Sequence, residues 1–151
     1  MMAQEPVTMA SWRPLPTLTA ENRFFWTAGA DGRLRFQHCP ACDYFIHPPA
    51  PICPKCLSEH VAPKAVSGRA TIRSVTVNHQ PWGPGLPVPY AIAIVGLDEQ
   101  EDLNLTTNIV GLAAEDVRIG LRVEVAFEAW GEIQVPLFRP VAPGEDAAHA
   151  P

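Results

Sequence analysis

The stretch QHCPACDYFIHPPAPICPKCL, residues 37–57, contains all four cysteines of the chain. They form two Cys-Pro-x-Cys pairs, Cys39 with Cys42 and Cys53 with Cys56, and ten residues separate the pairs. A Cys-x-x-Cys turn places two thiolates on one side of a tight loop, and two such turns facing each other make the four-sulfur cage that zinc prefers. We therefore predict a metal site with these four ligands. Zinc is the expected occupant, although iron uses the same ligands.

Other uses of four cysteines fit the sequence less well. Disulfides are not expected in a chain that lacks the pattern of a secretory signal, because cytosolic thiols stay reduced. A redox-active pair would open a helix in a βαβ unit, whereas these pairs lie in a loop-rich region. Four thiolates leave the metal no open position, so we expect a structural site with no catalytic role. His38, His47 and His60 are expected at the surface or beside the ligands.

The composition indicates a globular, mainly β protein. The chain is 47% hydrophobic and 18% charged, and its 17 prolines and ten glycines interrupt any long helix. No apolar segment is long enough to span a bilayer, and we expect a soluble, cytoplasmic protein without membrane contact. The charge is uneven. Residues 1–68 carry six basic and five acidic side chains, net +1, whereas residues 69–151 carry five and eleven, net −6.

The residues before the cysteines predict one helix. In the run PTLTAENRFFWTAGADG, which begins at Pro16, Thr19 is a candidate N-cap with Asn22 at the third helical position, and Gly29 is expected to end the helix. The alternating segment 33–37 is expected to be a strand that leads to Cys39. After a flexible lead, residues 1–12, we therefore expect a helix and metal-binding unit over residues 13–68.

Beyond Gly68 the sequence indicates a barrel. Five strands are expected, at residues 69–80, 90–98, 103–111, 121–130 and 132–140. The second of them, YAIAIVGLD, is nearly continuously apolar, as in a strand that is buried on both faces. Residues 113–120 form a short helical turn or tight loop between the third and fourth strands. This order fits a five-stranded OB-fold barrel over residues 69–141, followed by a disordered tail, 142–151.

Several segments together resemble the acyl-CoA-associated zinc-ribbon/OB-fold family. They are RPLPTLTAENRFFW, GRLRFQHCPAC, PPAPICPKC, VSGRATIRSVTVNH, PYAIAIVGLDE and VGLAAEDVRIGLRVEVAF with VPLFRP. The resemblance covers residues 13–141 and implies an N-terminal helical pair, a rubredoxin-like zinc ribbon ligated by Cys39, Cys42, Cys53 and Cys56, and an OB barrel. The family often has glycine after each Cys-x-x-Cys turn, where this chain has Asp43 and Leu57, and leucine adopts a left-handed conformation poorly.

The resemblance also implies a function. Members are non-catalytic subunits that pair with thiolase-like enzymes or MaoC-type enoyl-CoA hydratases, in acyltransferase or retro-aldol complexes whose substrates are acyl-CoA thioesters. We therefore expect an accessory or scaffold subunit of a hetero-oligomer, in which the partner supplies the catalytic residues and this chain helps to form the acyl-CoA site or channel. Whether it contacts coenzyme A directly stays open.

The loop HQPWGPGLPVPY, residues 79–90, contains four prolines and Trp82. Trp82 is either an interface anchor or a cap on its own barrel. Among the three consecutive aromatic residues 24–26, at least one is expected to face the barrel or a partner. The better candidates for binding the phosphates of coenzyme A are Arg13, Arg23, Arg33 and Arg35. For each of these arginines, a solvated surface role is the alternative. The candidate partner or acyl-CoA contacts are Phe25, Trp26, Arg33, Arg35, Trp82 and Tyr90.

Two other functions fit the sequence less well than the role of an accessory subunit. OB barrels with zinc ribbons also bind single-stranded nucleic acid, but the net charge of −6 on residues 69–151 has the wrong sign, so we expect no nucleic-acid partner. A self-sufficient enzyme would need a catalytic constellation. The acidic residues between 98 and 102 lie at a strand-to-strand turn, and we expect them to be solvated because nothing apolar nearby would raise a carboxyl pKa.

Overall fold

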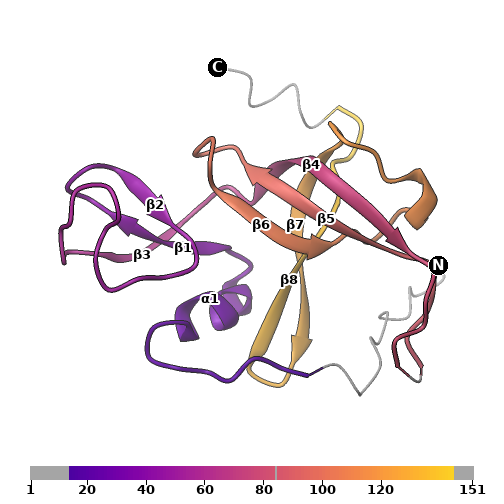
Figure 1. Cartoon of the computed structure of the whole chain (residues 1–151), viewed down its shortest axis with the longest axis horizontal. Coiled ribbons are helices and arrows are strands. Elements are labelled where there is room, and N and C mark those ends of the chain that lie inside the picture. The colour runs from indigo at the N-terminus through magenta and orange to yellow at the C-terminus, as the bar shows by residue number, and fades with distance from the viewer. Residues whose placement is uncertain (1–13, 84, 145–151) are drawn as a thin grey trace.

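The computed structural model describes residues 14–83 and 85–144, which form two antiparallel sheets and a short helix (Figure 1). The smaller sheet has the order β2-β1-β3 and contains β1 (Arg35–Cys39), β2 (Tyr44–Ile46) and β3 (Ala62–Ala65). We call residues 35–65 the ribbon. Within the described residues, no helix is long and apolar enough to cross a membrane.

The larger sheet is a five-stranded OB-fold barrel. Its strands are β4 (Arg69–Asn78), β5 (Tyr90–Leu97), β6 (Asn104–Asn108), β7 (Arg122–Trp130) and β8 (Ile133–Pro140). They pair in the order β6-β5-β4-β7-β8. A parallel bridge between Ile109 and Phe138 closes the barrel, and the Val110 amide donates a hydrogen bond to the Phe138 carbonyl at 2.8 Å. The predicted fold class is confirmed, including the short helical connection, which is the 3-10 helix η2 (Ala114–Asp116).

The N-terminal helix is shorter than predicted. Thr19 is not the N-cap, although it bonds with Asn22 in the turn before the helix: the Thr19 amide donates to Asn22 Oδ1 at 2.8 Å and the Asn22 amide donates to Thr19 Oγ1 at 3.3 Å. The regular helix α1 (Arg23–Thr27) begins only after this turn, with Asn22 at its N-cap. It continues as the 3-10 helix η1 (Ala28–Asp31), so the implied helical pair is one α-helix and one 3-10 helix.

The helical segment does not end at Gly29, as the sequence predicted, but at Gly32. The backbone of Gly32 has φ 75°, a left-handed conformation that glycine adopts at no steric cost. Gly29 lies inside η1 for a different reason. A Cβ atom at this position would collide with the Phe127 ring on β7 and with Gln134 on β8. The glycine is therefore required by close packing of the helix on the β7–β8 hairpin.

The ribbon, the helix and the barrel share one hydrophobic core. Phe25 from α1, Leu34 and Phe36 from the β1 segment and Phe45 from β2 belong to the same buried cluster as the inward side chains of the barrel. The end of the ribbon that carries the cysteines has only Cys39, Ile46 and Cys53 in its own buried cluster. Figure 1 shows α1 beside the ribbon and against β8. The ribbon thus has little core of its own.

The turn between β5 and β6 fastens the barrel to the ribbon. The Gln100 side chain accepts a hydrogen bond from the Phe45 amide at 2.7 Å and donates one to the Phe45 carbonyl at 3.0 Å. The Tyr44 hydroxyl donates to Asp102 at 2.7 Å. Glu99 accepts a hydrogen bond from the Ser67 amide at 2.5 Å. The Gln100 side chain therefore makes the two backbone hydrogen bonds with β2 that a neighbouring strand would otherwise make.

The acidic turn agrees with its prediction from the sequence, whereas strand β5 does not. Asp98, Glu99, Glu101 and Asp102 are all exposed. Three of them also have protein partners, and Asp98 pairs with Arg122 at 2.6 Å. The polar segment after the cysteines contains β3, which is fully exposed and shows no alternation. Strand β5 is buried on one face only, since Ile94 on its other face is 41% exposed.

Replacing Gln100 by alanine should lower the free energy of unfolding by about 1 to 3 kcal/mol, because the Phe45 amide and carbonyl lose their partners. Urea unfolding of the metal-loaded protein measures this change. Glu101→Ala is the matched control, since Glu101 lies in the same turn and is exposed. Equal stability of the two variants would show that the Gln100 bonds contribute nothing.

Candidate metal centre and surrounding residues

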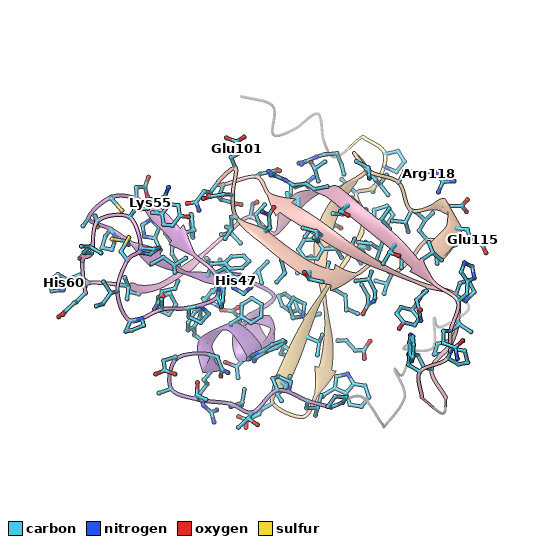
Figure 2. All side chains as sticks on the ribbon, in the orientation of Figure 1. His47, Lys55, His60, Glu101, Glu115 and Arg118 are labelled. Carbon is cyan, nitrogen blue, oxygen red and sulfur yellow. The ribbon has the colours of Figure 1, made fainter. Side chains whose placement is uncertain are left out.

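The four cysteine sulfurs lie together at the end of the ribbon. All lie within 4.8 Å of one another, and the Sγ atoms of Cys39 and Cys56, and of Cys42 and Cys53, are 3.6 Å apart. A tetrahedral zinc ion with Zn–S bonds of about 2.3 Å separates its sulfur ligands by about 3.8 Å. Figure 2 shows the sulfur atoms in yellow, near Lys55. The donor set and its dimensions fit a structural metal site, and Cys39 and Cys53 are fully buried.

The backbone turns sharply after each Cys-x-x-Cys pair. Asp43 and Leu57, the residues that follow the two Cys-x-x-Cys turns, have φ values of 55° and 62°. In the second turn the Leu57 amide donates to the Cys53 carbonyl at 3.0 Å, and the Cys53 amide donates to the Ser58 carbonyl at 2.9 Å. Both turns therefore adopt the left-handed conformation that glycine would favour, although neither residue is glycine.

Polar contacts stabilise Asp43 but not Leu57. Asp43 Oδ1 lies 2.7 Å from His38 Nε2 and 3.6 Å from Lys64 Nζ. The hydrogen bond with His38, followed by the charge of Lys64, lowers the pKa of the Asp43 carboxyl. Leu57 is 75% exposed and packs against little. The second turn thus has a strained residue without a compensating contact.

The thiols of the cluster differ in acidity, because burial and the neighbouring thiols raise the pKa of Cys42 to about 12, whereas the pKa of Cys53 is lowered. Burial raises the pKa of the Cys53 thiol, but hydrogen bonds from the amides of Cys56 and Lys55 and from neighbouring thiols lower it, to about 7. Four thiolates this close together repel one another strongly, so a bound metal ion is needed for all of them to ionise. The amide-lined cage is therefore suited to a metal dication.

None of the three histidines belongs to the cluster of potential ligands in the described residues. His38 is buried beside Asp43 and Phe45, and His60 is exposed. His47 was expected at the surface or beside the ligands, but it lies against the core (Figure 2). Its ring centroid is 5.1 Å from that of Phe25 and 5.0 Å from that of Phe36. Burial lowers the pKa of His47, and the neutral ring packs as an aromatic side chain.

The structure separates the aromatic candidates for partner contact. Phe25 is only 4% exposed, so it is a core residue and cannot contact a partner as folded. Trp26 is half-buried against Phe25, and Tyr90 is half-buried at the start of β5. Trp82 is 71% exposed and donates a hydrogen bond to Asn78 Oδ1 at 3.2 Å. Trp82 therefore does not fold back as a buried cap on its own barrel.

The arginine candidates for phosphate binding are not brought together into one site. Arg23 pairs with Glu132 at 2.8 Å, and Arg35 pairs with Asp31 at 2.6 Å. The hydrogen bond with Arg35 lowers the pKa of the Asp31 carboxyl to about 2. Arg33 is exposed, and Arg13 lies outside the described residues. At Arg23 and Arg35 a phosphate would have to compete with the paired carboxylate. Arg33 is therefore the most accessible of these arginines.

The chain matches two family models that join end to end. The ChsH2 rubredoxin-like zinc ribbon domain matches residues 26–61, which contain all four cysteines. The ChsH2 C-terminal OB-fold domain matches residues 63–128.

Relatives and solved structures agree with these matches. The chain is 37% identical over 136 residues to a probable enoyl-CoA hydratase alpha subunit of Thermomonospora curvata. This match covers 89% of the present chain but only 42% of the Thermomonospora protein. The chain is 34% identical over 91 residues to a DUF35 domain-containing scaffold protein of Methanocaldococcus jannaschii, which covers 59% of this chain and 63% of the other. A chain of the Ltp2-ChsH2(DUF35) aldolase superposes with a TM-score of 0.75 at 36% identity, over 83% of this chain and 98% of that one.

Substituting Leu57 by glycine should raise the free energy of unfolding by about 1 kcal/mol, because the left-handed backbone then carries no Cβ penalty. Leu57→Ala is the matched control, since alanine removes the same exposed side chain but retains Cβ. Chemical denaturation of both metal-loaded variants provides the measurement. A gain of equal size in the alanine variant would mean that backbone strain is not the cause.

Removing the metal should unfold the ribbon and also destabilise the barrel. The reason is that Phe36 and Phe45 connect the ribbon to the core shared with the barrel. The unaltered chain should bind roughly one metal ion. Chelator-treated protein and the Cys53→Ser variant should both bind less metal than this and melt at a lower temperature. Metal analysis and circular dichroism measure the two effects, and zinc re-addition is the control. A melting curve that chelation left unchanged would contradict the shared-core account.

Proposed function

The chain belongs to the ChsH2 (DUF35) family of zinc-ribbon and OB-fold proteins, and from this membership we propose that it is a non-catalytic accessory subunit of an acyl-CoA-processing complex. The observation that carries the proposal is the match, over 83% of this chain, to a chain of the Ltp2-ChsH2(DUF35) aldolase. The proposed partner is a thiolase-like enzyme or a MaoC-type hydratase. A relative named as a hydratase alpha subunit supports this choice of partner classes.

The proposed metal is zinc, in a structural role. Cys39, Cys42, Cys53 and Cys56 would saturate a tetrahedral ion, so the metal would have no position for a substrate or a water molecule. When bound, zinc would hold the ribbon together. Because Phe36 and Phe45 reach from the ribbon into the shared core, it would also fix how the ribbon packs on that core. The metal then contributes to folding and does not act on the acyl-CoA substrate.

Two acidic side chains of the β5–β6 turn, Asp98 and Asp102, are engaged in structural bonds. The acidic turn binds the ribbon through Asp102 and the barrel through Asp98, which pairs with Arg122. These contacts lower the pKa of both carboxyls, first through the hydrogen bonds from Tyr44 and Arg122, so they are held ionised and unsuited to general acid catalysis. We therefore assign the catalytic residues to the partner, with this chain bounding the acyl-CoA site.

Purification of the chain alone and together with an adjacently encoded thiolase-like or MaoC-type protein tests the proposal. The expected result is a stable hetero-oligomer that turns over an acyl-CoA substrate, whereas this chain alone is inactive. Turnover by the lone chain would contradict a non-catalytic role. Failure to bind a partner of either class would contradict the accessory-subunit proposal itself.

Trp82→Ala should weaken that pairing by about tenfold or more, because an exposed tryptophan on a proline-rich loop is a favourable interface anchor. Affinity for the partner is the measurement, and metal content, which should not change, is the control. Unaltered affinity would remove Trp82 from the interface while leaving the accessory role intact.

A further inference from the structure

The ring of His47 lies where the ribbon meets helix α1 (Figure 2). Its centroid is 5.1 Å from that of Phe25 on α1 and 5.0 Å from that of Phe36 on β1. The two phenyl rings are 5.8 Å apart, so the three rings pack on one another. Both phenylalanines are buried in the core that the helix, the ribbon and the barrel share. We call the three rings the aromatic joint.

The imidazole of His47 has no polar protein partner within residues 14–83 and 85–144. The ionisable side chains of the elements around the aromatic joint, from α1 to β2, either pair with other residues or are exposed. They are Arg23 with Glu132, Asp31 with Arg35, His38 with Asp43, Tyr44 with Asp102, the exposed Arg33, and Cys39 in the cysteine cluster. Among the described residues, no carboxylate is therefore placed to pair with a charge on His47.

These surroundings favour the neutral imidazole. Burial removes water from the ring, and an unpaired charge loses more free energy on burial than an uncharged ring does. Burial accordingly lowers the pKa of His47. Attraction between an imidazolium and the two phenyl rings acts in the opposite direction, but it is weaker than the hydration that a buried ion loses. The balance opposes protonation while the aromatic joint is closed.

Protonation of His47 and opening of the aromatic joint are therefore linked. In the open form the ring is hydrated and takes up a proton near its ordinary pKa of about 6.5. The closed form takes up the proton only at lower pH. Between these two pH values the open form holds more protons, so the closed form loses stability as the pH falls and keeps it in full above about pH 6.5. The nearby carboxyls of Asp31, Asp43 and Asp102 have lowered pKa values, so they stay ionised in this range.

We propose that His47 makes the aromatic joint an acid-sensitive device: in mildly acidic solution the imidazolium leaves the two phenyl rings, and helix α1 separates from the ribbon before the barrel unfolds. Opening would uncover Phe25, which is only 4% exposed in the closed form, together with the half-buried Trp26 that packs edge-on against it. Mild acid would thereby expose an aromatic surface that the chain covers at neutral pH. This inference concerns the joint alone and does not depend on the proposed function.

Replacing His47 by phenylalanine tests the device in the metal-loaded full chain, because phenylalanine keeps an aromatic ring at this position but takes up no proton. Melting temperatures are compared at about pH 7.5 and at about pH 5, on either side of the ordinary histidine pKa. On acidification, the melting temperature of the unaltered chain should drop further than that of His47→Phe, by about 3 °C or more. His60→Phe is the matched control, since His60 is exposed, and it should show the same drop as the unaltered chain.

Amide hydrogen exchange locates the opening. The amides of Phe25 and Trp26 both donate to the Asn22 carbonyl. After correction for intrinsic exchange, their protection should fall about tenfold more on acidification in the unaltered chain than in His47→Phe, whereas the amides of β4 and β5 stay protected. The comparison uses pH values at which both proteins hold the same amount of metal, so that the cysteines contribute equally. If His47→Phe does not fold, His47→Gln, which is also uncharged, replaces it.

Three results would overturn the inference. Equal drops in melting temperature in the unaltered chain and in His47→Phe would mean that His47 contributes nothing to the acid sensitivity. A smaller drop in the unaltered chain would mean that attraction to the phenyl rings outweighs the lost hydration. An equal loss of protection in α1 and in the strands β4 and β5 would mean that the whole fold opens and not the aromatic joint.

Discussion

The binding of four cysteine sulfurs by one metal ion is the interaction on which the rest of the structure depends. The end of the ribbon has only three buried residues in its own cluster, and two of them are cysteines. Hydrophobic burial on that scale is too small to offset the conformational entropy of ordering the segment. A metal ion held by the four cysteines would supply the missing stabilisation and would hold β1 and β2 in place, from which Phe36 and Phe45 enter the core shared with the barrel.

A shared core makes the ribbon and the barrel one folding unit, although they are two sheets. The contacts that join them differ in kind. Phe25, Phe36 and His47 provide aromatic packing between the helix and the ribbon, whereas Gln100 provides directional hydrogen bonds from the β5–β6 turn. Packing tolerates small shifts, but paired hydrogen bonds to one backbone position fix the register. The Gln100 contact therefore sets the orientation of the ribbon against the barrel.

A rigid unit of this kind is suited to presenting a surface to a partner. The acidic side chains of the β5–β6 turn pair with the ribbon and with Arg122, whereas Ile94 in the middle of β5 is 41% exposed. The loop with Trp82 follows β4 directly, and its tryptophan is held by Asn78. The cysteine cluster and the shared core thus maintain the shape, and Trp82 stays exposed at the surface.

The sequence by itself determined the four-cysteine cluster and the five barrel strands, because each depends on local spacing or alternation. It did not determine β3, whose exposed residues form a strand only because β1 lies beside them, or the end of the helix, which the packing of Gly29 on Phe127 displaces. Periodicity also shows that β5 is apolar on both sides but not what covers each side. Tertiary structure decided that Phe25 is core, that Trp82 is exposed and that Ile94 lies on an open face, because burial depends on which distant segments meet.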